Sequence, residues 1–477
     1  GVAVDTAIIV ELDGRIPDGD LSEVVSVLQG SSPIAASYAL DGQTLTITPS
    51  APLALGTEYT VSTATGSAGF TTAPLAITAS SGEGPLSTAV ASLAGAEFLA
   101  DGSGVVQASG ALDEGGRFTI AAPLFVPQTL SIDDAALGGG VYTASVELAP
   151  YIFVPDFGNN RVVRLPAVDA PASDYVSITT VAHEGGTYNL QGPIYLHTDY
   201  NAGLIYLLDS PANPGESDSP GTGPSVLVRL ADFPPESGGE DAEIKVLSDV
   251  FGTGQDVSGA LQLAVLDDGR VVIPSFNNPE LAVVPADFSQ SAAAAALTPS
   301  ATQAALGGIA PLGGTEFVFN VPDYNSGAVD LQVLASPSAT ASTEFVSGGI
   351  GDGSGPAELV AATTLVFDPT SDRLYVSDTG APGQSFTAEN GRIGRYEADG
   401  TSRANYGTFD ADSSGGAGEF RFPIALGVLP DRRLYIMDEG LDRLVSIELS
   451  AFDGGSVDWQ ESAADAGFSF EYWFNYS

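Results

Sequence analysis

Short apolar runs that alternate with turn residues extend along the whole chain. Residues 44–48 read Thr-Leu-Thr-Ile-Thr, and residues 59–63 repeat the same two-residue period. Successive side chains of a strand point to opposite faces, so this period predicts half-buried strands. Asp41-Gly42 precedes the first run and is a hairpin signal, because glycine adopts positive φ at little cost. Several such strands at short spacing predict a β-sandwich in residues 1–73.

The same stretch resembles the bacterial Ig-like domain that is common in surface and secreted proteins. The segments that carry this resemblance are 1–8, 40–49 (Leu-Asp-Gly-Gln-Thr-Leu-Thr-Ile-Thr-Pro), 52–53, 56–61 (Gly-Thr-Glu-Tyr-Thr-Val) and 70–72. The resemblance implies an Ig-like sandwich of about 70 residues. Members of this family usually carry several more residues before the position of Gly1. We therefore expect the first strand to be short, disordered or supplied by another chain.

Residues 74–150 have a weaker pattern with three strand candidates. These are 117–120, 127–132 and 141–148. The first candidate, read together with the glycine before it (Gly-Arg-Phe-Thr-Ile), resembles the carboxypeptidase regulatory-like type of small sandwich. Two interpretations stay open for this intermediate β-region: a second small sandwich, or strands associated with the domain that follows.

From residue 151 the chain repeats an apolar strand that ends in Asp, then a turn and a second strand. The clearest copies centre on Asp156, Asp378 and Asp438, and the weaker ones on Asp209, residues 269–277 and Asp323. From the first to the last anchor the mean spacing is about 56 residues. A repeat of this size with about four strands is typical of a propeller blade. Residues 151–458 are therefore predicted to form a roughly six-bladed β-propeller.

The Asp-turn-Asn-Arg form of residues 156–161 resembles the NHL repeat of β-propellers. A further strand is expected before most copies, at 193–197, 261–266, 363–367 and 424–429. A seventh blade drawn from the strands before residue 150 is an alternative. The predicted fold class is all-β: an Ig-like β-sandwich plus a roughly six-bladed β-propeller.

Composition restricts the function classes. The 477 residues hold 15 Lys and Arg against 60 Asp and Glu, a formal net charge of −45, and no Cys. So acidic a chain is repelled by nucleic acid and by anionic membrane surfaces. Without Cys there are no disulfides, thiolate nucleophiles or cysteine-ligated metals. Apolar residues make up 44% of the chain, which favours a folded protein over a disordered one.

The acidity itself has two interpretations, a halophile-like surface or an extracellular calcium-binding protein. No apolar run reaches the ~18 residues that a membrane-spanning helix needs. The chain begins at Gly1 without a basic segment and an apolar stretch. We expect that a signal peptide has been removed and that the protein is extracellular or on the cell surface.

Groups able to perform catalysis are scarce. Histidine is the usual acid–base group near neutral pH, and the chain has only His183 and His197. We place His183 in a loop and His197 at the end of a strand. They form a metal site or proton relay only if the fold brings them together; otherwise they are two unrelated residues of the propeller.

The recurring aspartates Asp156, Asp209, Asp378 and Asp438 have two interpretations. Each carboxylate either accepts N–H groups of the turn that follows, or the four ring one face of the propeller and attract cations. Separate Ca²⁺ candidates are the pairs Asp199 with Asn201 and Asp410 with Asp412, in which two oxygen ligands stand two residues apart. No catalytic residue is assigned, and Ca²⁺ is the one cofactor that the sequence suggests.

The C-terminal segment 459–477 ends in an aromatic cluster. Its aromatic residues are Phe468, Phe470, Tyr472, Trp473, Phe474 and Tyr476. An exposed aromatic strand would aggregate, so it needs a partner. One interpretation is a strand that closes or covers this chain. The other is addition to a sheet of a neighbouring copy, for which the Ig-like domain is a natural acceptor; such head-to-tail pairing would form a filament.

The sequence therefore favours a non-enzymatic extracellular or cell-surface protein with a structural or interaction role. We expect its partner to be a protein, with a second copy of the chain as one candidate. The alternative is a calcium-dependent six-bladed propeller hydrolase of the lactonase or esterase kind. Carboxylates gathered around a cation at the mouth of the channel would favour the enzyme.

Overall fold

The computed structural model describes the chain in ranges separated by gaps. The described ranges are 7–11, 25–41, 44–54, 57–63, 75–93, 96–108, 117–131, 136–138, 141–210, 225–231, 242–247, 262–274, 280–289, 295–296, 308–323, 328–339, 341–345, 362–378, 391–409, 415–454 and 457–470. Two compact units divide it, Gly1–Leu148 and Ala149–Ser477.

The first unit begins with two three-stranded sheets. One has the order β1-β5-β4 (Ile8–Glu11, Thr44–Pro49, Ala36–Asp41), the other β3-β2-β6 (Ser32–Ile34, Val25–Gln29, Tyr59–Thr63). Their common core contains Val25, Val27, Leu45 and Ile47. In β5 the two apolar residues are buried while the threonines between them are less so, which confirms the two-residue period read from the sequence.

The strands from residue 75 to residue 147 pair among themselves in two further sheets. The first has the order β11-β7-β15-β14 with β8 on β7 (Val105–Ala108, Leu75–Ser81, Val141–Glu147, Ala136–Gly138, Gly84–Pro85). The second has the order β10-β9-β12-β13 (Ala96–Leu99, Val90–Leu93, Arg117–Ala121, Gln128–Ser131). The three predicted strands correspond to β12, β13 and β15. Pairing of β15 with β7 is parallel, and Ile77, Val106 and Phe118 are buried.

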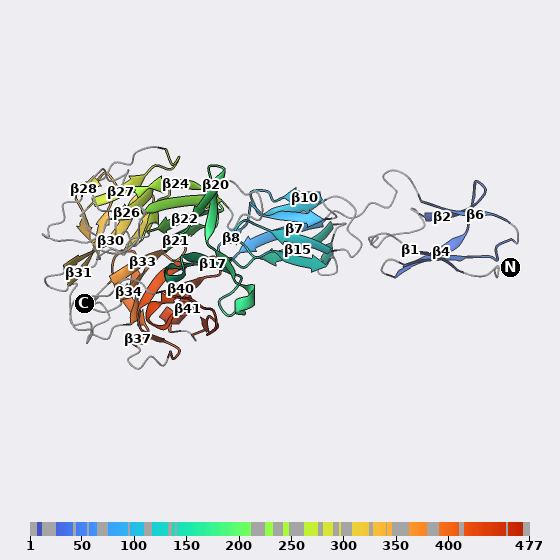
Figure 1. The fold of residues 1–477 in the computed structure, drawn as a ribbon. Coiled ribbons are helices and arrows are strands. Elements are labelled where there is room, and N and C mark those ends of the chain that lie inside the picture. Colours follow the sequence, from blue (N-terminus) through green and yellow to red (C-terminus); the bar gives the residue numbers. More distant parts are fainter. Residues whose placement is uncertain are drawn as a thin grey trace. The chain divides into compact units, whose positions relative to one another are not determined.

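The second unit is a β-propeller (Figure 1), and its described residues form six blade sheets and two short two-stranded pairs. The first blade is β16-β17-β18 (Ile152–Asp156, Arg161–Leu165, Val176–Ile178), and the second is β21-β22-β23-β24 (Pro193–Asp199, Leu204–Asp209, Val226–Ala231, Glu243–Val246). The third is β25-β26-β27-β28 (Ala264–Val265, Val271–Pro274, Glu280–Val284, Ala295–Ala296), and the fourth is β29-β30-β31-β32 (Ile309–Gly313, Glu316–Asp323, Ala328–Leu334, Thr343–Glu344). The fifth is β33-β34-β35-β36 (Ala362–Asp368, Arg373–Asp378, Arg392–Glu397, Ser402–Tyr406), and the sixth is β39-β40-β41-β42 (Pro423–Val428, Arg433–Asp438, Arg443–Glu448, Trp459–Glu461).

Two short pairs accompany the blades. These are the hairpin β19-β20 (Thr180–His183, Gly186–Asn189) and the parallel pair β37-β38 (Thr408–Phe409, Glu419–Phe420). Short 3-10 turns cover Phe157–Asn159, Ala172–Asp174, Glu439–Leu441 and Leu449–Asp453. The strands predicted before the repeat copies appear as β21, β25, β33 and β39, the innermost strands of their sheets.

Stacking of the blades explains why their central strands are apolar without alternation. Every residue of β16 and of β40 is buried. A strand covered on both faces buries all its side chains, so its sequence is a continuous apolar run. Leu365, Leu374 and Tyr396 of the fifth blade pack with Val318 and Leu331 of the fourth. Similar clusters join the third blade to the fourth and the fifth to the sixth.

Candidate functional site

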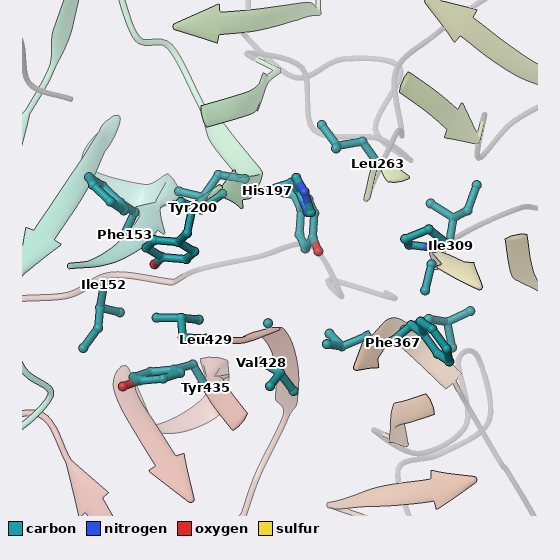
Figure 2. Close-up of a pocket in the computed structure, with 18 residues that line it drawn as sticks. Ile152, Phe153, His197, Tyr200, Leu263, Ile309, Phe367, Val428, Leu429 and Tyr435 are labelled. Carbon is teal, nitrogen blue, oxygen red and sulfur yellow. The ribbon is translucent and has the colours of Figure 1, made fainter. Parts of the chain in front are cut away.

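The innermost strands of the propeller surround a central cavity of about 110 Å³ (Figure 2). Its wall comes from β16, β21, β29, β33, β39 and β40, together with Tyr200 just after β21, Leu263 just before β25 and Leu429 just after β39. Figure 2 shows apolar side chains from several blades around it, among them Ile152, Ile309, Phe367 and Val428. The cavity is therefore better suited to apolar groups than to charged ligands.

The tyrosines in this wall direct their hydroxyl groups to partners within the protein. Tyr200 donates to the carbonyl oxygen of Tyr151 (2.6 Å), and Tyr435 donates to a carboxylate oxygen of Asp431 (2.5 Å). Burial raises the pKa of Tyr195 to about 12, an effect that its hydrogen bond with Gln262 partly offsets. These hydroxyl groups stay protonated near neutral pH and serve packing.

His197 is the one imidazole among the residues that line the cavity. It lies in β21, and its ring centroid is 6.3 Å from that of Tyr206. Burial lowers the pKa of His197, and the charge of Asp199 opposes this only in part. The imidazole is thus neutral near pH 7, the form that can accept a proton.

This electrostatic assignment predicts an acid-shifted titration. Because the chain has only two histidines, the His183→Gln variant leaves one imidazole to follow by NMR. We expect His197 in that variant to titrate below its ordinary value of 6.5. Its neutral form stabilises the fold above pH 6.5, and that contribution is lost as the pH falls through the lowered pKa. A midpoint at or above 6.5 would contradict the burial of this ring.

A buried glutamine beside the cavity joins four blades. Gln262 is fully buried just before β25, and its Nε2 donates to Tyr195 Oη (3.1 Å) and to the carbonyl oxygen of Leu365 (2.6 Å). Its Oε1 accepts the backbone N–H groups of Ile309 (2.9 Å) and Leu365 (3.1 Å). We call this arrangement the Gln262 brace. It links the third blade to the second, fourth and fifth.

The recurring aspartates are placed away from this cavity. Asp156, Asp209, Asp378 and Asp438 are all fully buried at the ends of their strands, and none lines the cavity. Asp378 is paired with the Arg392 guanidinium at 3.0 Å. The carboxylates are therefore used inside the blades.

Two of these carboxylates accept backbone N–H groups that lie just before the innermost strand of the same blade. Asp209 accepts from Gln191 and Gly192, the latter at 2.6 Å, and from the Tyr188 hydroxyl at 2.6 Å. Asp438 accepts from Arg421 and Phe422, both at 3.0 Å. Burial raises the pKa of each carboxyl, and these hydrogen bonds oppose the rise.

The fourth blade uses an amide in the same role. Asn320 Oδ1 accepts the N–H of Gly308 (2.6 Å), and Asn320 Nδ2 donates to the carbonyl oxygen of Ala362 in the fifth blade (2.5 Å). The sequence pattern predicts Asp323, three residues further along, as the anchor of this copy. The equivalence with Asp209 shows that the anchor is Asn320.

The remaining predicted site residues are dispersed. Asp199 accepts the N–H groups of Asn201 (3.1 Å) and Ala202 (2.9 Å), which is the geometry of an Asx turn. Asp410 and Asp412 lie outside the described residues. His183 ends β19, not a loop as predicted, and its Nδ1 is 2.8 Å from the carbonyl oxygen of Ala242. In the described part of the chain, no group of three or more His, Asp and Glu residues is placed to hold a metal.

Of the predicted aromatic strand, two residues are described, and both pack within this chain. Phe468 is 7% exposed and Phe470 1% exposed, and their rings stack at 4.9 Å. Phe468 also stacks on Tyr175 at 6.0 Å. Tyr472, Trp473, Phe474 and Tyr476 lie outside the described residues.

Comparison with known proteins identifies the beginning of the chain. The profile of the bacterial Ig-like domain family matches residues 1–78. These residues form a bacterial Ig-like domain. That family is typical of surface proteins. Within the described ranges, no helix has the length and apolar character needed to cross a membrane.

Similar solved structures cover much of the chain at low identity. Nidogen in its complex with laminin is 13% identical over 65% of this chain and 92% of its own, with a TM-score of 0.41. Inactive virginiamycin B lyase from Staphylococcus aureus with quinupristin is 12% identical over 57% and 70%, at 0.35. Hydrazine synthase from Kuenenia stuttgartiensis is 11% identical over 64% and 76%, at 0.38. No curated protein matches the sequence.

Proposed function

We propose that this chain is a non-enzymatic structural and interaction protein of the bacterial exterior. The observation that carries the proposal is the use of its recurring carboxylates. These carboxylates form hydrogen bonds and ion pairs inside the blades, and none of them lines the cavity, whose wall is mainly apolar. They belong to Asp156, Asp209, Asp378 and Asp438. The bacterial Ig-like domain of residues 1–78 supports a surface location.

The size of the cavity also supports a scaffold role. Small-molecule sites usually enclose about 300–1,000 Å³, whereas this cavity has about 110 Å³. It admits only a few non-hydrogen atoms in the conformation described. The propeller then acts mainly through its outer surface, whose acidic character favours cations and basic protein partners over anionic ones.

Self-association remains part of the proposal. The expectation of a filament depended on a free aromatic strand, and Phe468 and Phe470 are buried in their own chain. Any filament would therefore use other surfaces or the residues beyond Phe470. Net repulsion of the acidic chain must be overcome for copies to associate, so salt or Ca²⁺ should strengthen assembly through screening.

The second candidate is a hydrolase, and one observation favours it. His197 presents a neutral imidazole to the cavity, and such a group can act as a general base. Ca²⁺ would have to be held by residues other than the four buried aspartates.

Two measurements test the proposal. On intact cells of the producing bacterium, added protease or antibody should reach the chain while a cytoplasmic control protein stays protected. The purified chain should show no hydrolysis of lactone and ester panels with or without Ca²⁺. Protection of the chain until lysis would contradict the surface role. Turnover that requires Ca²⁺ and is lost in His197→Ala, but kept in His183→Gln, would establish the hydrolase.

A further inference from the structure

One side chain in the wall of the central cavity has polar atoms that the described part of the protein does not use. His197 lies in β21 with part of its surface exposed, and neither of its ring nitrogens forms a hydrogen bond with a described residue. A neutral imidazole carries one N–H donor and one acceptor nitrogen. Thr198, the next residue, points to the opposite face of β21, because successive side chains of a strand alternate. The His197 ring is therefore able to bind a polar group of a molecule in the cavity.

The tyrosine hydroxyl groups of the wall already have partners within the protein. Tyr200 donates to a backbone carbonyl oxygen at 2.6 Å, and Tyr435 donates to a carboxylate oxygen at 2.5 Å. Tyr195 accepts from the side-chain amide of Gln262 at 3.1 Å. His197 is thus better placed than these tyrosines to hold a hydroxyl group that comes from outside the protein.

The wall favours a ligand without charge. The described residues that line the cavity include no Asp, Glu, Lys or Arg. Burial lowers the pKa of His197, so its ring is uncharged near pH 7. A charged molecule would lose its hydration in the cavity without gaining a group of opposite charge.

The volume of the cavity limits the size of this ligand. A dry apolar cavity of about 150 Å³ holds one benzene molecule. The central cavity has about 110 Å³, which in proportion gives room for roughly four or five non-hydrogen atoms. Figure 2 shows Phe153 and Tyr200 toward one side of His197 and Leu263 and Ile309 toward the other. A ligand that fits therefore has a short hydrocarbon part and a single polar group.

We propose that the central cavity binds a neutral short-chain alcohol of about three or four carbon atoms. Its hydroxyl group donates a hydrogen bond to the unprotonated ring nitrogen of His197, and its hydrocarbon chain lies against the apolar wall. Burial of about four carbon atoms together with one hydrogen bond corresponds to a dissociation constant on the order of 1 mM. The alcohol is bound without chemical change, so this inference does not depend on the surface role proposed above.

The NMR signals of His197 test the pairing directly. In the full chain with His183→Gln one imidazole remains, and 1-butanol should shift its signals in a saturable way with a dissociation constant on the order of 1 mM. Methyl propyl ether has the same atomic composition but no O–H group, so it should bind about fivefold more weakly. Signals that do not move with 1-butanol, or equal affinities for the alcohol and the ether, would overturn the proposal.

The length of the alcohol gives a second measurement that needs no change in the cavity. The affinity should rise from ethanol to 1-butanol and level off at 1-hexanol, because about 110 Å³ does not enclose the longer chain. Propylammonium and propanoate are charged molecules of similar size and should not displace 1-butanol. An affinity that keeps rising through 1-hexanol would indicate adsorption to an apolar surface and would contradict a site of limited length.

Two variants identify the group that holds the alcohol. His197→Phe keeps a planar ring and removes both nitrogens, so it should abolish the preference for 1-butanol over the ether. Tyr206→Phe is the matched control, because its ring centroid lies 6.3 Å from that of His197 but the residue does not line the cavity. This control should keep the full preference in a titration detected on the ligand. A preference that survives in His197→Phe would place the hydrogen bond elsewhere and overturn the assignment.

A cavity-filling variant tests the location. Gly427 of β39 lines the cavity, and a Cβ there would have Leu429 Cδ1 as its nearest atom, at 3.6 Å. Gly427→Val therefore adds carbon atoms without a close contact and should weaken the binding of 1-butanol by roughly tenfold. The control is Gly186→Val in β20, outside the cavity, where the Cβ would lie 3.5 Å from the carbonyl oxygen of His183. Equal affinities in the two glycine variants would contradict the site, and the series of alcohols decides if Gly427→Val does not fold.

Discussion

Asp209→Ala is expected to destabilise the propeller by roughly 3–5 kcal/mol, because it leaves buried donors without an acceptor. The Tyr188 hydroxyl and the N–H groups of Gln191 and Gly192 all lose their partner at once. Asp209 is fully buried, so water cannot readily replace the carboxylate. Calorimetry of the propeller transition, or denaturant unfolding followed by intrinsic fluorescence, measures the loss.

Two matched variants separate this effect from a general loss of an acid. Asp209→Asn keeps one acceptor oxygen and should lose distinctly less stability. Asp199→Ala removes the acceptor of two exposed turn N–H groups, which water can solvate, so its cost should stay below about 1 kcal/mol. Equal costs for Asp209→Ala and Asp199→Ala would refute the role of the strand-end carboxylate as a lock within its blade.

Gln262→Leu is expected to lower the stability of the propeller by a similar amount, roughly 3–5 kcal/mol, because buried backbone groups in several blades lose their hydrogen-bond partner. The N–H groups of Ile309 and Leu365 lose an acceptor, and the carbonyl oxygen of Leu365 loses a donor. Leucine has nearly the volume of glutamine, so the change isolates the hydrogen bonds from the packing. Denaturant unfolding measures the loss against Gln191→Leu, whose side chain is exposed.

Gln262→Glu gives a pH signature for the same brace. The new carboxylate still accepts both N–H groups. Its ionised form has no proton to donate to the carbonyl oxygen of Leu365, which lies 2.6 Å from Gln262 Nε2 in the natural chain. Burial should raise the pKa of this new carboxyl above its ordinary value, and the protonated form can donate. The variant should therefore gain stability relative to the natural chain as the pH falls from 7 to 5. Parallel pH profiles would contradict the brace.

The strands and their repeat were predictable because they depend on local patterns. Apolar runs, turn residues and the Asp at each strand end locate β16, β22, β34 and β40 from the sequence. The apolar continuity of β40 reflects blades stacked on both faces, which any propeller sequence must satisfy. The Asx-turn interpretation predicted the correct type of bond, because the carboxylates of Asp209 and Asp438 accept backbone N–H groups. It placed these donors after the Asp in the sequence. In Asp209 and Asp438 they lie 16 to 18 residues before it.

The features that were missed depend on contacts distant in sequence. Gln262 is a single polar residue before a two-residue strand, and its partners lie 47, 67 and 103 residues away. No periodicity marks such a residue. The position of His197 at the cavity likewise follows from how the blades close around the centre. The segment before Phe470 was recognised by its aromatic content alone. The hydrogen bond from Ser469 N–H to Asp156 Oδ1 (2.9 Å) joins residues that are 313 positions apart in the sequence.

The placement of the basic residues has a consequence for proteolysis. Arg161 and Arg164 lie in β17, Arg392 and Arg395 in β35, and Arg443 in β41, each inside a strand of a blade. A trypsin-like protease must draw the chain around its target into an extended, accessible loop, which a paired central strand does not permit. Cleavage after these strand residues should therefore be slow until their blades open, and its rate then reports on the opening of the propeller itself.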